Sequence, residues 1–233
     1  KRAKLNRKNM KNIFRNIAVG AIAVMMSVES LLAAVPAGYK ASPSMEKFKT
    51  DMLSTAKTMT SMSSEFIQTK HIEGMTKDIE STGVFCFKKE DKLSLEYKKP
   101  MPSQIVVNGT KIRMVSGGRS TVMDGNSNPA VANLKNMMSS CLSGQLPTNS
   151  KEIKLELFEN DTHYLVYVTP SKDSKLAKRA DHMEVVVKKA DYTIESFKMV
   201  EKAKGDKGQD YMQFTFTNMK RNVAIDDAIF KIQ

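Results

Sequence analysis

The 233-residue sequence contains no tryptophan, two cysteines and only three histidines. His71, His163 and His182 are far apart in the chain, and none is paired with another histidine, a cysteine or an acid at the spacing of a metal site. The G-x-S-x-G string of hydrolases and a glycine-rich phosphate loop are absent as well. These absences argue against an enzyme, a metal site or a cofactor, and they predict surface positions for the histidines.

Long apolar runs are also scarce. The stretch Ile17–Met26 is almost wholly apolar but too short for a membrane span of about 20 residues, and Glu29 interrupts its extension. Seven Lys/Arg residues precede it, and small residues stand at the −3 and −1 positions of a cut after Ala37. We therefore predict a cleaved signal peptide at residues 1–37, with residues 1–9 upstream of the true start if translation begins at Met10, and a retained anchor as the alternative. No cysteine follows the apolar core, so the mature protein is not expected to be lipidated.

The formal net charge of +12 is unevenly distributed, because residues 1–37 contribute +6 and residues 38–233 the remaining +6. The second segment has no linker and no internal repeat, and its length suits a single domain. Its lysine-rich turns alternate with acids and lack interleaved aromatic residues, which predicts a solvated surface rather than a nucleic-acid interface. Attraction to an anionic membrane surface or an acidic partner stays open.

Alternating patterns predict most of the secondary structure. Leu93, Leu95 and Tyr97 alternate with polar residues, as in a strand with one buried face. Two further apolar runs, Ile105–Val107 and Lys111–Val115, flank Asn108-Gly109, a dipeptide typical of a tight hairpin turn. Similar alternation recurs between residues 153 and 219, for a total of ten or eleven strands.

Two segments have helical spacing instead. Ser42-Pro43 is expected to start a helix whose apolar stripe runs on to Met62, and a second helix is expected over Val131–Gln145. Asp226-Asp227 is expected to cap a final helical turn. The fold class is therefore α+β, with a strongly curved antiparallel sheet around helices.

The two cysteines and the many methionines leave alternatives open. If a signal peptide directs the chain to an oxidising compartment, Cys86 and Cys141 either form a disulfide or remain two buried thiols. Seventeen residues are methionine. Flexible thioether side chains suit a pocket that accepts ligands of varying shape, but they also fill ordinary cores.

The string F-K-K-E-D-K-L-S-L-E-Y-K-K-P followed by I-V-V-N-G-T-K-I resembles the LolA family, the periplasmic carriers of outer-membrane lipoproteins. Upstream, the stretch Ser63–Thr69 resembles the family's S-F-x-A-x-F-x-Q motif. Downstream, Phe214–Asn218 and Ile225–Phe230 resemble its C-terminal motifs. Together these segments extend over about residues 45–233. Leu95 stands where the family motif has tryptophan, Lys89 where it has arginine, and Glu90 where it has proline.

The resemblance implies an unclosed β-barrel with a lid of α-helices over a hydrophobic cavity that holds acyl chains. The implied cavity residues are Phe66, Phe85, Phe87, Leu93, Leu95, Tyr97, Ile105, Val107, Ile112 and Met114. The implied lid residues are Leu134, Met137, Met138 and Leu142. Lys89 is the candidate latch between barrel and lid, although lysine cannot form the planar two-bond fork of arginine.

The resemblance further implies a monomeric, non-catalytic, periplasmic protein. Its expected partners are acylated lipoproteins or another lipid, an inner-membrane lipoprotein-releasing transporter and an outer-membrane acceptor. Three alternatives remain: a carrier or sensor of another lipid on the same fold, a structural β-domain, and a hydrolase whose residues converge only in space.

Overall fold

A single antiparallel sheet dominates the structure, a computed structural model that describes residues 35–124, 152–174, 176–203, 205 and 208–232. Residues Gly38–Gln233 form one unit. The predicted signal peptide and the second predicted helix fall outside the described residues almost entirely, so both remain predictions.

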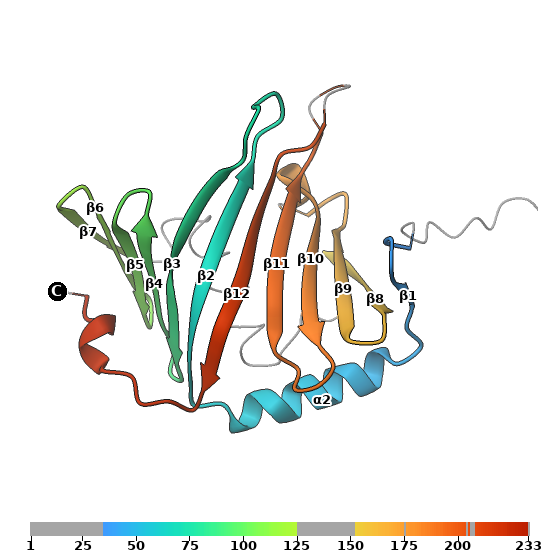
Figure 1. The fold of residues 1–233 in the computed structure, drawn as a ribbon, viewed down its shortest axis with the longest axis horizontal. Coiled ribbons are helices and arrows are strands. Elements are labelled where there is room, and N and C mark those ends of the chain that lie inside the picture. Colours follow the sequence, from blue (N-terminus) through green and yellow to red (C-terminus); the bar gives the residue numbers. More distant parts are fainter. Residues whose placement is uncertain (1–34, 125–151, 175, 204, 206–207, 233) are drawn as a thin grey trace, which may run out of the picture. The chain divides into compact units, whose positions relative to one another are not determined.

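Over the described ranges the sheet has twelve strands in the order β1-β8-β9-β10-β11-β12-β2-β3-β4-β5-β6-β7, with β1 and β7 at its two ends (Figure 1). All neighbouring strands are antiparallel, as the hairpin signals in the sequence predicted. The strands are β1 (Lys40–Ala41), β2 (Ser61–His71), β3 (Ile79–Lys88), β4 (Lys92–Lys99), β5 (Ser103–Asn108), β6 (Lys111–Ser116), β7 (Arg119–Asp124), β8 (Ile153–Glu159), β9 (His163–Pro170), β10 (Ala180–Lys188), β11 (Ile194–Glu201) and β12 (Tyr211–Arg221). The unclosed, curved antiparallel sheet expected from the sequence is therefore confirmed.

One α-helix, α2 (Met45–Thr58), lies within the described residues and runs beneath the ends of β9–β12 (Figure 1). Its buried residues, Phe48, Met52 and Ala56, recur at intervals of four, so one stripe faces the sheet. The predicted limits of this helix were wrong at both ends. It begins at Met45 rather than Pro43, and it ends at Thr58 because β2 begins at Ser61, which places Met62 in a strand.

The turns follow the local chemistry of the sequence. Gly109 has φ +60°, as the hairpin between β5 and β6 requires. Asn160 Oδ1 accepts hydrogen bonds from the backbone N–H groups of Thr162 and His163, which forms the β8–β9 turn. Glu90 has φ +74°, a conformation that the proline of the LolA motif cannot adopt. Proline therefore would not fit at this position of the β3–β4 turn.

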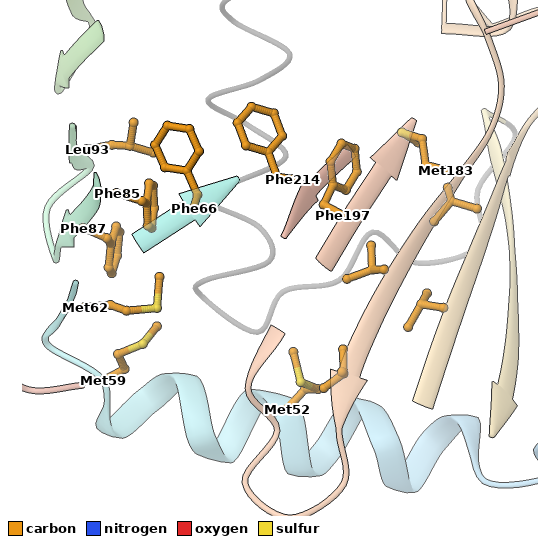
Figure 2. Close-up of a cluster of buried hydrophobic side chains, with 14 of the residues drawn as sticks. Met52, Met59, Met62, Phe66, Phe85, Phe87, Leu93, Met183, Phe197 and Phe214 are labelled. Atoms are coloured by element: carbon orange, nitrogen blue, oxygen red, sulfur yellow. The ribbon is translucent and has the colours of Figure 1, made fainter. Parts of the chain in front are cut away.

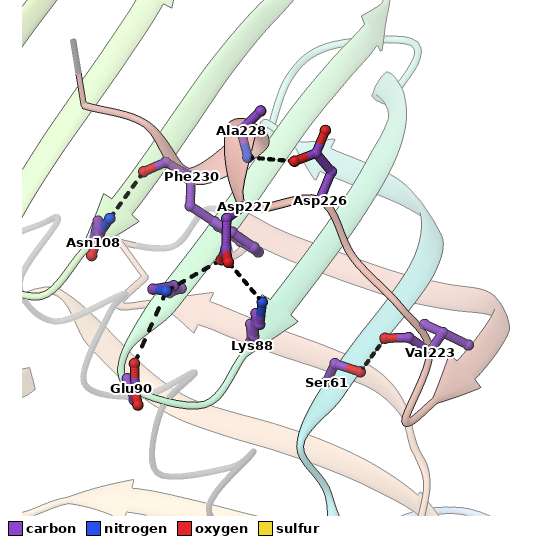
Figure 3. Close-up of polar contacts among 10 residues, drawn as sticks. Ser61, Lys88, Glu90, Asn108, Val223, Asp226, Asp227, Ala228 and Phe230 are labelled. Atoms are coloured by element: carbon purple, nitrogen blue, oxygen red, sulfur yellow. Dashed lines mark hydrogen bonds and ion pairs between the residues drawn. The ribbon is translucent and has the colours of Figure 1, made fainter.

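The C-terminal residues pack against β4 and β5 through a short 3₁₀ helix, η3 (Asp227–Phe230). Asp226 caps it by accepting a hydrogen bond from Ala228 N at 2.9 Å, as predicted. Asp227 pairs with Lys88 at 3.0 Å and with Lys92 at 3.2 Å (Figure 3). Phe230 is 1% exposed. The C-terminal segment is thus fixed to the hairpin that carries Lys89.

Candidate functional site: the apolar face of the sheet

The ten predicted cavity residues lie on one face of the sheet. One row of paired residues contains Phe85, Leu95, Ile105 and Met114, and the next row contains Phe87, Leu93, Val107 and Ile112. Phe66 and Tyr97 belong to a third row, on either side of Gly83. All ten belong to the same hydrophobic cluster. The fold thus brings together the side chains that the LolA resemblance implied, and their role as a lipid-binding cavity stays a prediction.

The same face continues across the other half of the sheet, where the sequence predicted strands but assigned no site residues. Paired positions from β8 to β12 carry apolar side chains in two rows. These are Leu157, Val166, Val185, Phe197 and Phe214 in one row, and Leu155, Val168, Met183, Met199 and Met212 in the other. Figure 2 shows labelled side chains from both halves pointing into one interior. The apolar face is therefore about twice as wide as the LolA-like motifs indicated.

The aromatic centre of this face depends on a glycine. The Phe66 ring lies edge-on to Tyr97, with ring centroids 5.2 Å apart, and tilts against Phe214 at 5.6 Å. A Cβ atom on Gly83 would stand 2.7 Å from Phe66 Cζ and 2.1 Å from Glu96 O. Only glycine leaves room for the ring at this point of β3.

Helix α2 closes one end of the apolar face. The Phe48 side chain is fully buried and meets the Tyr164 ring edge-on at 4.9 Å. The Tyr192 hydroxyl donates a hydrogen bond to Asp51 Oδ2 at 2.5 Å, which ties the helix to the β10–β11 turn. Burial is the main cause, and this hydrogen bond the second, of a raised pKa for Tyr192, so its hydroxyl stays protonated. The helix is thus held to the sheet by both apolar and polar contacts.

Lys89, the candidate latch, contacts α2. Its Nζ donates a hydrogen bond to Lys57 O at 2.9 Å, and its backbone N–H donates to Thr60 O at 2.9 Å. Lys57 is in the last turn of α2, where backbone carbonyls have no partner within the helix. The structure therefore shows Lys89 joining the β3–β4 turn to the end of α2.

The proposed lid and half of the proposed cysteine pair cannot be placed. Leu134, Met137, Met138, Leu142 and Cys141 lie outside the described residues. Cys86 is a free thiol in this structure, 3.7 Å from Ser63 Oγ, on the strand face opposite Phe85 and Phe87. The lid, the latch and the disulfide stay predictions.

The histidines are less isolated than the sequence suggested, because each one has a carboxylate nearby. His182 lies 2.9 Å from Asp181 and 3.1 Å from Glu184, and His71 lies 2.7 Å from Asp78. His163 Nε2 lies 3.0 Å from Glu195, and its Nδ1 lies 2.7 Å from the Thr162 hydroxyl. The Thr162 hydroxyl also contacts Asn160 Oδ1 in the β8–β9 turn, at 3.3 Å. The His163–Glu195 contact reaches from β9 to β11, whereas the contacts of His71 and His182 stay within one hairpin or one strand. All three histidines are on the strand face opposite the apolar side chains.

Neither a metal site nor a membrane helix emerges from the described part of the chain. No group of three or more His, Cys, Asp or Glu side chains there could hold a metal ion. No helix among the same residues has the length and hydropathy needed to span a membrane.

Comparison with known families agrees with this geometry. Residues 57–233 match the family described as outer membrane lipoprotein carrier protein LolA. The chain belongs to this family. A comparison with curated protein sequences finds no significant match.

Several solved structures are similar to this chain at low sequence identity. A LolA superfamily protein from Nitrosomonas europaea is 9% identical, with a TM-score of 0.42, over 80% of this chain and 96% of its own. The lipoprotein LppX from Mycobacterium tuberculosis is 13% identical, with a TM-score of 0.40, over 80% of this chain and all of its own. The Pseudomonas aeruginosa MucA/MucB complex matches at 11% identity and a TM-score of 0.44, over 79% of this chain and 59% of its own.

Proposed function

We propose that this protein is a non-catalytic periplasmic carrier that shields the acyl chains of lipoproteins and moves them from the inner to the outer membrane. The observation that carries the proposal is the continuous apolar face, formed by paired side chains from β8 at one side to β6 at the other. Membership of the LolA family supports the lipoprotein cargo.

The energetics favour such a surface for lipid carriage. Each methylene group transferred out of water contributes about 0.8 kcal/mol, so acyl chains free in water would cost tens of kcal/mol. Bound chains would be protected by side chains such as Leu95 and Ile112, which are fully buried. The proposed donor and acceptor are an inner-membrane lipoprotein-releasing transporter and an outer-membrane acceptor.

The test is native mass spectrometry with lipid extraction on the mature protein purified from its periplasm. Co-purified triacylated lipoprotein or its lipidated peptide is the expected result. Free phospholipid or fatty acid alone would instead assign another lipid cargo. A protein that is empty and fails to take up a hydrophobic dye would refute carriage.

A matched pair of variants locates the binding surface. Ile105 and Gln104 are neighbours on β5, and Ile105 is on the apolar face while Gln104 is on the opposite face. Ile105→Glu should lower lipid recovery strongly because it places a charge among apolar side chains. Gln104→Glu should leave recovery unchanged. Circular dichroism of both variants separates lost binding from lost folding.

A further inference from the structure

The apolar face becomes progressively more exposed with distance from α2. Along β2, Phe66 is 1% exposed, Gln68 is partly exposed and Lys70 is exposed. Along β3 in the same direction, Phe85 is fully buried and Ile79 is 41% exposed. The end near α2 is therefore dry, and the opposite end, beyond Phe66, meets water.

Polar groups with little protein bonding gather at this wet end. Gln68 pairs with Ser81 across β2 and β3, and Tyr97 follows on β4 opposite Gly83. Among the residues that the structure describes, Gln68 Nε2 donates only to the Met212 thioether, a weak acceptor, at 3.0 Å. Within the described residues, the hydroxyls of Ser81 and Tyr97 have no hydrogen-bond partner.

The side chains of Gln68, Ser81 and Tyr97 can all donate hydrogen bonds, and Tyr97 does so as long as it is protonated. Burial raises the pKa of Tyr97, so its hydroxyl stays protonated. None of the three groups is among the buried side-chain atoms that lack a hydrogen-bond partner, so each can bond water, and a ligand acceptor would take the place of that water. An acyl ester or amide carbonyl is such an acceptor, and it stands at the head end of every lipid acyl chain.

A cation lies one step further along the same face. Lys70 pairs with Met212 and Ile79, which places it two residues, or roughly 7 Å, beyond Gln68 on β2. Its side chain is exposed and has no ion-pair partner among the described residues. A negative group attached to the lipid head would therefore meet an uncompensated positive charge.

Building on the proposed function, we propose that this polar end fixes the orientation and the headgroup class of the cargo. Gln68, Ser81 and Tyr97 bind the carbonyls that link the acyl chains to the head, and Lys70 binds an anionic group next to them. The ends of the chains then point toward α2. The anion is either a lipid phosphate or an acidic side chain beside the lipidated end of a lipoprotein.

The first experiment measures headgroup preference with the mature protein. Phosphatidylglycerol and phosphatidylcholine with identical chains displace a bound hydrophobic dye, and triacylated lipopeptides with an acidic or a basic residue after the lipidated end do the same. We expect roughly two- to five-fold tighter binding of the anionic member of a pair at low salt. Both phospholipids carry a phosphate, and only in phosphatidylcholine is its charge balanced by choline. Preference among phospholipids alone therefore assigns a phosphate of uncompensated charge, and preference among lipopeptides assigns the acidic side chain.

Two variants with the same change in charge assign the preference to this end. Lys70→Gln should abolish the headgroup preference. Lys220→Gln should retain it, because Lys220 is an exposed residue of β12 at the opposite end of the strands from Lys70. Equal binding of both headgroups by the unmodified protein would overturn the inference and leave carriage intact. Failure to bind any lipid would overturn both.

The second experiment measures the orientation of the bound lipid by quenching of tryptophan fluorescence. Because the chain has no tryptophan, the signal comes from the introduced residue alone. Phe87→Trp and Met59→Trp place reporters near α2, and Ile79→Trp places one at the wet end. Lipids brominated at the chain end should quench the first two more strongly than the third. The reverse order would overturn the proposed orientation.

Discussion

Gly83→Ala should be unusually destabilising for a change of one methyl group. The new Cβ would stand 2.1 Å from Glu96 O and 2.7 Å from Phe66 Cζ, far inside ordinary contact distances. The aromatic ring can shift slightly, but the carbonyl belongs to the β4 backbone and moves only if the β3–β4 pairing shifts. Overpacking usually costs 1–3 kcal/mol, and the backbone clash puts this case near the upper end, at about 3 kcal/mol.

The assay is urea denaturation followed by circular dichroism, together with thermal melting. A loss of about 3 kcal/mol corresponds to a Tm lower by roughly 6–12 °C for a domain of this size. The control is Ser81→Ala on the same face of β3, which should change the free energy of unfolding by less than about 0.5 kcal/mol.

A double variant separates the two clashes. Phe66→Leu relieves the contact with the ring but leaves the carbonyl in place, so Gly83→Ala combined with it should not recover the stability of Phe66→Leu alone. A Gly83→Ala protein within about 0.5 kcal/mol of the unmodified protein would refute the close packing of β3, β4 and the Phe66 ring.

Three further predictions concern the edges of the site. Lys89→Met removes the bond to Lys57 O and should lower the free energy of unfolding by about 0.5–1 kcal/mol in urea titrations. Burial lowers the pKa of His182, but hydrogen bonds with Glu184 and its neighbouring aspartate outweigh burial and raise the pKa overall. The stability that the protonated His182 contributes should be complete below about pH 6.5 and decline as the pH rises through the folded-state pKa. The His182→Gln variant should show a weaker pH dependence of its urea midpoint between about pH 5.5 and 8. Burial also raises the pKa of Cys86, so iodoacetamide should modify it more slowly in the folded than in the urea-unfolded protein, as measured by peptide mass spectrometry.

Matched variants make these three results interpretable. Lys220→Met should not reproduce the effect of Lys89→Met, and an equal loss would contradict a specific role for Lys89. His71→Gln should flatten the pH trend less than His182→Gln, because the His71 side chain is 30% exposed and that of His182 only 13%. If Cys86 resists modification after unfolding without reductant, it is disulfide-bonded, contrary to the free thiol described above.

The resemblance to the LolA family supplied the ten cavity positions, and alternation with a period of two residues independently placed Leu93, Leu95 and Tyr97 on one strand face. Once the Asn108-Gly109 turn fixed the pairing of β5 with β6, Ile105 and Met114 had to share a face. Such local rules determine both the strands and their inward side chains. They do not show which distant strands become neighbours, so the β8–β12 half of the face was missed.

The limits of α2 show where local patterns are ambiguous. Met59 and Met62 continue the helical spacing, but Ser61 begins β2, and the following inward positions include Ser64 as well as Phe66. Because Ser64 interrupts the apolar alternation, the start of β2 was predicted as a continuation of the helix. The contact of Lys89 with Lys57 O was equally hidden, since it depends on where the helix ends.

The open ends of the sheet have a mechanical consequence. A closed barrel has a circumference fixed by its number of strands and its stagger, because every edge is hydrogen-bonded to the next. Here β1 and β7 are the two ends of the strand order, on opposite sides of ten continuously paired strands. A small change of twist at each pairing adds up along the sheet and widens or narrows its curve without breaking a ladder. The space within the curve of such a sheet can therefore change in size, as the proposed carriage of different cargoes requires.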